Sequence, residues 1–166
     1  MSKLVKQTED ALHTLVVEAL GKAIAAGELP AAAMPSFIVE IPQDRANGDY
    51  STNAAFVGAK VFRMAPVKIA QAIAKYIDLS DSYFSECTVA GAGFINFRLS
   101  DRYYADILLD VLSKGEAYGR SDYGKGKRVN VEFVSANPTG PMHMGNARGG
   151  ALGDCLAAGL EMAGYT

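Results

Sequence analysis

Two strand-like runs in the middle of the chain constrain its fold more than any other feature. The runs YFSECTVA (83–90) and GFINFRLS (93–100) are rich in aromatic and β-branched residues, and Gly91-Ala92-Gly93 joins them. A short connection that contains glycine is typical of a β-hairpin. We therefore expect an antiparallel pair of strands, against which the neighbouring segments must pack.

Helix-like segments lie on both sides of this expected hairpin. Near the N-terminus, apolar residues recur every three or four positions, which predicts an amphipathic helix that ends near Gly27 and Pro30. Further helices are expected over 53–63, over 66–77, which begins with a proline, and over 101–114. The hydroxyl side chains placed to cap the helices that follow them are Ser51, Thr52 and Ser100.

Residues 1–115 are expected to form a small α+β domain with a mostly antiparallel sheet. Between the first two helices, SFIVEI (36–41) predicts a short strand, because it is rich in residues that favour extended structure. The polar segment 43–53 predicts a loop that turns at Asn47-Gly48.

The remaining residues differ in character from this first domain. The segment 116–127 is rich in glycine and is expected to be a linker. After it, RVNVEFVSA (128–136) is almost continuously apolar, which is typical of a strand inside a covered parallel sheet, and a helix-like segment follows. One strand and one helix cannot complete such a sheet. We expect 128–166 to be the opening piece of a second domain in a longer protein; the alternatives are docking onto the first domain or exchange with a second copy.

Composition excludes several classes of protein. The chain is 49% hydrophobic with a formal net charge of −2, which excludes a disordered chain and a strongly basic one, although a local basic patch for nucleic acid stays possible. Cys87 and Cys155 are far apart and have no clustered histidines, so neither a disulfide framework nor a metal site is expected. The N-terminal segment carries charges, and no run has transmembrane length. A cytoplasmic protein without membrane contact is the expectation.

The segment NPTGPMHMGN (137–146) lies between the expected buried strand and the last helix. In open α/β folds, ligands bind where strands lead into helix N-termini, and those N-termini favour phosphate. His143 and Asn146 are one helical turn apart, so both can face one ligand. The spacing fits neither a dinucleotide-binding glycine motif nor a P-loop.

The string VNVEFVSANPTGPMHMGNARGGALGDCLAAGLEMAGY closely resembles the start of the catalytic domain of arginyl-tRNA synthetases, with HMGN in the place of the HIGH motif of class I enzymes. Upstream, NGDYSTNAAF and GAGFINFRLS resemble the N-terminal additional domain of that family. The resemblance implies an α+β additional domain, followed by the first strand, loop and helix of a Rossmann-like catalytic domain.

The resemblance also implies an activity and its residues. Enzymes of the family activate L-arginine with ATP, accompanied by Mg²⁺, and transfer it to tRNA(Arg). They carry no prosthetic group and are expected to be monomeric, whereas the fragment is expected to be inactive and able to self-associate through its incomplete catalytic domain. The implied residues are His143 and Asn146 for catalysis, these two and Gly145 for ATP, and Glu132, Ser135 and Asn137 for arginine. Asn146 keeps an N–H donor but cannot become cationic as histidine can, which puts that histidine's role in question here.

In this family the additional domain contacts the D-loop of tRNA. Phe94 and Asn96 match residues given that role, and they are two apart in an expected strand, so they share a face. An aromatic ring that stacks on an unpaired base, beside an amide that contacts the base edge, is a common RNA-binding arrangement. The alternative is that Phe94 packs in the core and Asn96 bonds to backbone.

Each implied role has a simpler rival. Glu132 could pair with a nearby cation, His143 could be only a helix cap, and Asn137 could be only a turn residue. For the whole chain, one rival function is a free-standing RNA-binding module without catalysis. Another is a different nucleotidyltransferase with an HxGH-type motif, which would leave the N-terminal domain unexplained.

Overall fold

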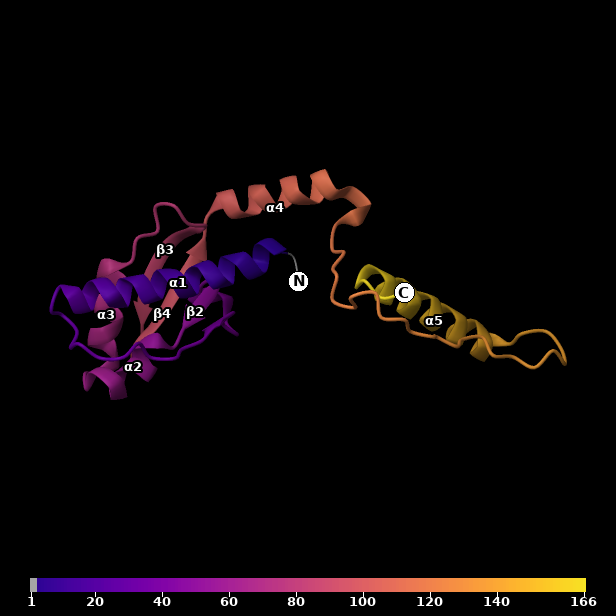
Figure 1. Cartoon of the computed structure of the whole chain (residues 1–166), viewed down its shortest axis with the longest axis horizontal. Coiled ribbons are helices and arrows are strands. Elements are labelled where there is room, and N and C mark those ends of the chain that lie inside the picture. The colour runs from indigo at the N-terminus through magenta and orange to yellow at the C-terminus, as the bar shows by residue number, and fades with distance from the viewer. Residues whose placement is uncertain (1–2) are drawn as a thin grey trace. The chain divides into compact units, whose positions relative to one another are not determined.

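The computed structural model describes residues 3–166 and divides the chain into two compact units, one up to Asp110 and one from Val111 to Thr166 (Figure 1). The boundary falls within a helix, α4 (Asp101–Lys114), which begins and ends where the sequence predicts.

The first unit contains a four-stranded antiparallel sheet. Its strands are β1 (Val39–Glu40), β2 (Tyr50–Thr52), β3 (Phe84–Ala90) and β4 (Phe94–Leu99), in the spatial order β1-β2-β4-β3. The expected hairpin is confirmed: β3 and β4 pair antiparallel, with Thr88 opposite Asn96. On its other side, β4 pairs with β2, and Ser51 lies opposite Asn96.

Three helices complete this unit: α1 (Lys3–Ala25), α2 (Ala54–Phe62) and α3 (Pro66–Tyr76), all close to the predicted ranges. Helices α1 and α3 pack against each other, and side chains of α1, α3 and β4 share one hydrophobic core. The larger fully buried side chains of that core include Leu12, Val16, Leu20, Ile69, Ile73, Ile95 and Phe97. Because side chains alternate along a strand, Phe94, Asn96 and Arg98 of β4 project from the opposite face.

The structure corrects the prediction for residues 36–53. The strand expected over 36–41 shortens to β1, and the expected loop contains both a 3₁₀ turn, η1 (Arg45–Asn47), and β2. Three residues are too few to show an alternating pattern, and β2 forms because β4 offers it a ladder of partners. Ser51 is therefore a strand residue and does not cap α2.

The two other expected caps differ from each other. The hydroxyl of Thr52 accepts a hydrogen bond from the amide of Ala54 at 3.3 Å, so it binds at the start of α2. The hydroxyl of Ser100 is buried and has no hydrogen-bond partner among the described residues; only its carbonyl contacts α4, accepting from the amide of Tyr103 at 3.0 Å.

In the second unit, η2 (Gly115–Ala117) precedes an irregular segment and the long helix α5 (Met144–Met162), which confirms the last predicted helix. The strand expected over 128–136 does not form: Val134 has φ 55°, and Phe133 is 41% exposed. A strand needs a neighbour to accept its ladder of hydrogen bonds, and the described part of this unit contains no other strand.

Residues 121–129 bond to the C-terminal residues of the same unit. The amide of Gly124 donates to the carbonyl of Ala163 at 2.8 Å, and the amide of Val129 donates to that of Thr166 at 2.9 Å. Along residues 3–166, no helix is both long enough and apolar enough to cross a lipid bilayer.

Candidate functional site

The open face of the sheet in the first unit carries a hollow of about 340 Å³. We call it the sheet hollow. The polar and aromatic residues that line it are Glu40, Gln43, Asn47, Ser51, Phe94 and Asn96. They come from three strands and from the loop that joins β1 to β2, so the hollow depends on the pairing of β2 with both of its neighbours.

Strand register explains why these residues meet. Glu40 lies opposite Ser51, Ser51 opposite Asn96, and Asn96 opposite Thr88, so one row of polar side chains crosses the sheet. Directly paired residues of an antiparallel sheet have their Cβ atoms about 5 Å apart and on the same face. The row therefore forms a continuous polar floor.

Phe94 supplies an aromatic surface at the edge of this floor. Its side chain is 45% exposed, and its ring centroid lies 4.7 Å from that of Phe56 on α2, at an interplanar angle of 59°. Phe56 therefore supports the ring without covering it. An exposed, supported ring of this kind can stack on a nucleobase.

Asn96 supplies an amide with unused hydrogen-bonding capacity. The residue is only 7% exposed, yet its side-chain amide takes part in none of the hydrogen bonds found among residues 3–166. The amide is not among the fully buried polar atoms that lack a partner, so it still reaches the hollow and is free to bind a ligand there. The rival placement, with Phe94 in the core and Asn96 bonded to backbone, is not what the structure contains.

The second unit contains another hollow, of about 270 Å³, at the start of α5. We call it the loop hollow. Ser135, Asn137, His143 and Asn146 all line it. Four of the six residues that the sequence assigns to ATP or arginine are thus brought together.

His143 and Asn146 cap α5 reciprocally. Nδ1 of His143 accepts from the amide of Gly145 at 3.1 Å, and Oδ1 of Asn146 accepts from the amide of His143 at 3.2 Å. A Cβ at position 145 would lie 2.9 Å from Cε1 of His143, so a larger residue there would require the imidazole to shift. His143 therefore caps the helix, as the simpler alternative predicted. Nε2 of its ring takes part in none of the hydrogen bonds described.

Glu132 lies apart from the loop hollow. It is exposed and lines neither hollow, whereas the sequence predicts an acid buried in the middle of a strand. That prediction is wrong in this structure because the strand itself does not form. The carboxylate consequently avoids the desolvation that burial would impose.

Other reactive groups have no evident site. Burial, followed by the nearby charge of Glu86, raises the pKa of the Cys87 thiol to about 11, so this thiol is a poor nucleophile at neutral pH. Burial likewise raises the pKa of Tyr50 to about 12. Within residues 3–166, histidine, cysteine and acidic side chains form no cluster of three or more that could hold a metal ion.

The sequence alone indicates no site role for Glu40, Gln43, Asn47 or Ser51. They reach the sheet hollow only through β2, the strand that the sequence did not predict. The polar segment around Asn47-Gly48 was the available signal, since polar loops that connect paired strands often line binding surfaces.

Known proteins that are similar to this chain match either its first unit or nearly its whole length. The family model described as the arginyl tRNA synthetase N terminal domain matches residues 10–99. The arginine–tRNA ligase of Acetivibrio thermocellus is 47% identical over 165 residues, which are 99% of this chain and 29% of that protein. The arginine–tRNA ligase of Ruegeria sp. is 48% identical over 155 residues, 93% of this chain and 27% of that protein.

Among solved structures, arginyl-tRNA synthetase from Plasmodium falciparum has a similar fold, with a TM-score of 0.56 at 21% sequence identity over 95% of this chain and 29% of that one. The chain thus spans less than a third of the length of these relatives. The family model matches residues within the unit that carries the sheet hollow, whereas the two ligases match nearly the whole chain.

Proposed function

The chain belongs to the family of arginyl-tRNA synthetase N-terminal domains, and from this membership we propose that its first unit binds the tRNA of an arginine–tRNA ligase. One observation carries the proposal: the sheet hollow places the exposed ring of Phe94 beside the unpartnered amide of Asn96. In the proposed complex, an unpaired base of the tRNA D-loop stacks on Phe94 while Asn96 exchanges hydrogen bonds with the edge of that base.

The charge of the chain suits a local contact. A net charge of −2 gives little long-range attraction to a polyanion, so stacking and hydrogen bonding must supply most of the specificity. The test is a titration of the 166-residue chain against an arginine tRNA transcript, compared with a transcript that lacks the D-loop bases. Tighter binding of the intact transcript supports the proposal, and equal binding of the two contradicts it.

For the second unit, we propose a role in the activation of arginine within a full-length ligase. The carboxylate of arginine attacks the α-phosphate of ATP and pyrophosphate leaves. The arginyl-adenylate then passes arginine to a hydroxyl of tRNA, and AMP leaves. Catalysis of this kind depends on positioning and on the stabilisation of charge at the phosphate. The N-terminus of α5 in the loop hollow suits that charge, and Mg²⁺ would accompany the nucleotide.

Specific residues follow from this proposal. His143, Gly145 and Asn146 would contact ATP, while Ser135 and Asn137 would contact arginine. Glu132 would bind the guanidinium group, since a carboxylate and a guanidinium form charge-assisted paired hydrogen bonds. For that, residues 128–136 must pair with further strands and so bring Glu132 to the site.

We propose that the 166-residue chain alone is inactive. The loop hollow consists of one loop and one helix end, and Glu132 lies outside it. Pyrophosphate exchange in the presence of arginine, ATP and tRNA tests this directly: no exchange above background is expected, and measurable exchange would contradict it.

A further inference from the structure

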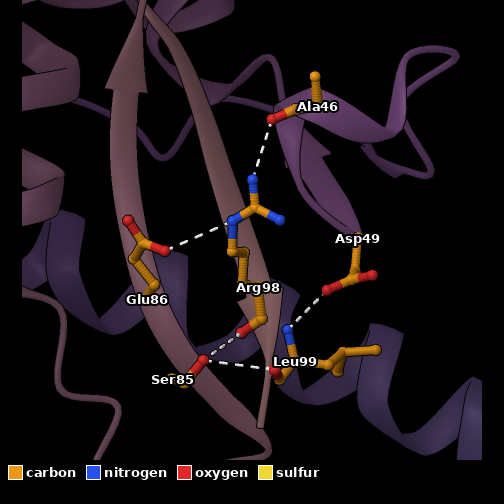
Figure 2. A network of polar contacts seen from close by, with 6 residues as sticks. All are labelled: Ala46, Asp49, Ser85, Glu86, Arg98 and Leu99. Carbon is orange, nitrogen blue, oxygen red and sulfur yellow. Dashed lines mark hydrogen bonds and ion pairs between the residues drawn. The ribbon is translucent and has the colours of Figure 1, made fainter.

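The turn at residues 44–49, which contributes Asn47 to the lining of the sheet hollow, is held against β4 by a set of polar contacts (Figure 2). Nη2 of Arg98 donates to the carbonyl of Ala46 at 3.0 Å. The amide of Asp49 donates to the carbonyl of Phe97 at 2.8 Å, and Oδ2 of Asp49 accepts from the amide of Leu99 at 2.8 Å. Three successive residues of β4 therefore bind this turn.

The internal geometry of the turn is also specified. Oδ1 of Asp44 accepts from the amide of Ala46 at 2.9 Å, which fixes the start of η1. Gly48 has φ 101°, and a Cβ there would lie 2.6 Å from the carbonyl oxygen of Phe97, so only glycine allows this close approach to the strand. Asn47, between these two fixed points, lines the sheet hollow.

One strand thus performs two tasks. Phe94 and Asn96 line the hollow, and the next residues of the same strand hold the turn that brings Asn47 to it. We propose that Asn47 is a further RNA-contacting residue and that Arg98 is a positioning residue, which acts on RNA binding through the turn at 44–49. This inference rests on the proposed function of the sheet hollow and adds a second amide to its base-binding groups.

Arg98 could instead contact RNA phosphate directly. Its side chain is about half exposed and lies on the same face as Phe94 and Asn96. Against direct contact, its guanidinium is already engaged on two sides: Nη2 with Ala46, and Nε with Glu86 at 3.5 Å (Figure 2). The two roles differ in salt dependence, because the loss of one phosphate contact lowers the slope of log affinity against log salt by about 1.

The experiment measures the affinity of the 166-residue chain for an arginine tRNA transcript at several salt concentrations. The variants are N47A, R98A, R98K and the double variant N47A/R98A, with F94A to report on the hollow itself. R102A is the control, since it removes an equal charge from an exposed ion pair on α4, where Arg102 lies 3.8 Å from Asp106. Circular dichroism verifies the folded state of each variant.

We expect N47A and R98A each to lower affinity by about three- to tenfold, the range of one hydrogen bond, with the salt slope unchanged. The double variant should have about the same affinity as the single variant with the lower affinity. Once the Asn47 side chain is removed, the effect of Arg98 on its position no longer matters for binding. R98K should not restore binding, since lysine lacks the planar fork that reaches both Ala46 and Glu86. R102A should bind like the original chain.

Other outcomes overturn the inference. Unchanged affinity in N47A, while F94A binds weakly, removes Asn47 from the site and leaves the proposed function intact. A lower salt slope in R98A with recovery in R98K, or additive losses in the double variant, shows that Arg98 does not act through the turn. If R98A does not fold, R98K and N47A still decide between these outcomes. Unchanged affinity in both F94A and N47A contradicts the proposed function itself.

Discussion

Ser51 on β2 lies directly opposite Asn96 on β4, so two polar side chains meet on the open face of the sheet. Asn96 is almost fully buried there without a hydrogen-bond partner among residues 3–166, and Phe94, two residues earlier, leaves its ring exposed. This combination suits the binding of a planar ligand with a polar edge.

The first prediction concerns the ring of Phe94. We expect Phe94→Ala to lower the affinity for an arginine tRNA transcript by about 5- to 150-fold, because base–aromatic stacking contributes about 1–3 kcal/mol. Fluorescence anisotropy measures the change. Tyr123→Ala is the matched control, since Tyr123 is also aromatic, is 79% exposed and lies outside both hollows. Equal losses in the two variants would show that the effect is not specific to the sheet hollow.

The second prediction separates binding from stability at Asn96. Asn96→Ala should lower RNA affinity about three- to tenfold while the free energy of unfolding stays about the same, because the amide makes no hydrogen bond within residues 3–166 that the substitution could remove. Thr52→Val is the contrasting variant: the Thr52 hydroxyl donates to the carbonyl of Ile38 at 2.8 Å, so its loss should lower stability by about 1 kcal/mol without an effect on affinity. Urea denaturation and anisotropy measure both quantities. A clear loss of stability in Asn96→Ala would mean that the amide has a structural partner.

The third prediction concerns the close approach of Gly48 to β4. Gly48→Ala should lower the free energy of unfolding by about 1–3 kcal/mol, because both the positive φ and the contact with the Phe97 carbonyl oppose a Cβ. Gly27→Ala is the control: Gly27 has φ 75° but no atom within 4 Å of the added Cβ, so only the backbone cost remains. Similar losses in both variants, measured by urea denaturation, would show that the contact with β4 is unimportant.

The fourth prediction addresses the second unit within a full-length arginine–tRNA ligase that contains these residues. His143→Ala should lower kcat for pyrophosphate exchange strongly, and Glu132→Gln should mainly raise KM for arginine. His143→Asn is the informative control, because asparagine is a good N-cap but lacks the imidazole. If His143→Asn restores full turnover, His143 acts only as the cap seen in its contacts with Gly145 and Asn146.

The sequence predicted the long elements well and the short ones poorly. The helices α1, α3 and α5 and the β3–β4 hairpin have strong periodic or turn signals, and the structure confirms them. β2 was missed because three residues carry no period of their own; its partner β4, more than 40 positions away, decides its conformation. The strand expected over 128–136 does not form for the opposite reason. Its apolar pattern favours a strand, but the described part of its unit contains no other strand with which it could pair.

The candidate sites show the same difference between positions set by local spacing and positions set by contacts with distant segments. Phe94 and Asn96 could be placed on one face from their spacing within a strand, and His143 and Asn146 from their spacing within a helix. Asn47 could not be placed from the sequence, because its position depends on the contacts of Arg98 and Asp49 across the sheet. Glu132 was placed wrongly because its burial depends on a strand that does not form here.

The most direct test of the account is an NMR titration of the ¹³C,¹⁵N-labelled 166-residue chain with an arginine tRNA transcript, following the side-chain amide signals of asparagine and the ring signals of phenylalanine and tyrosine. The account predicts large changes for the Asn96 amide and the Phe94 ring, with none for Tyr123. Binding that perturbs other residues while both of these signals stay unchanged would contradict the assignment of the sheet hollow as the RNA-contacting site.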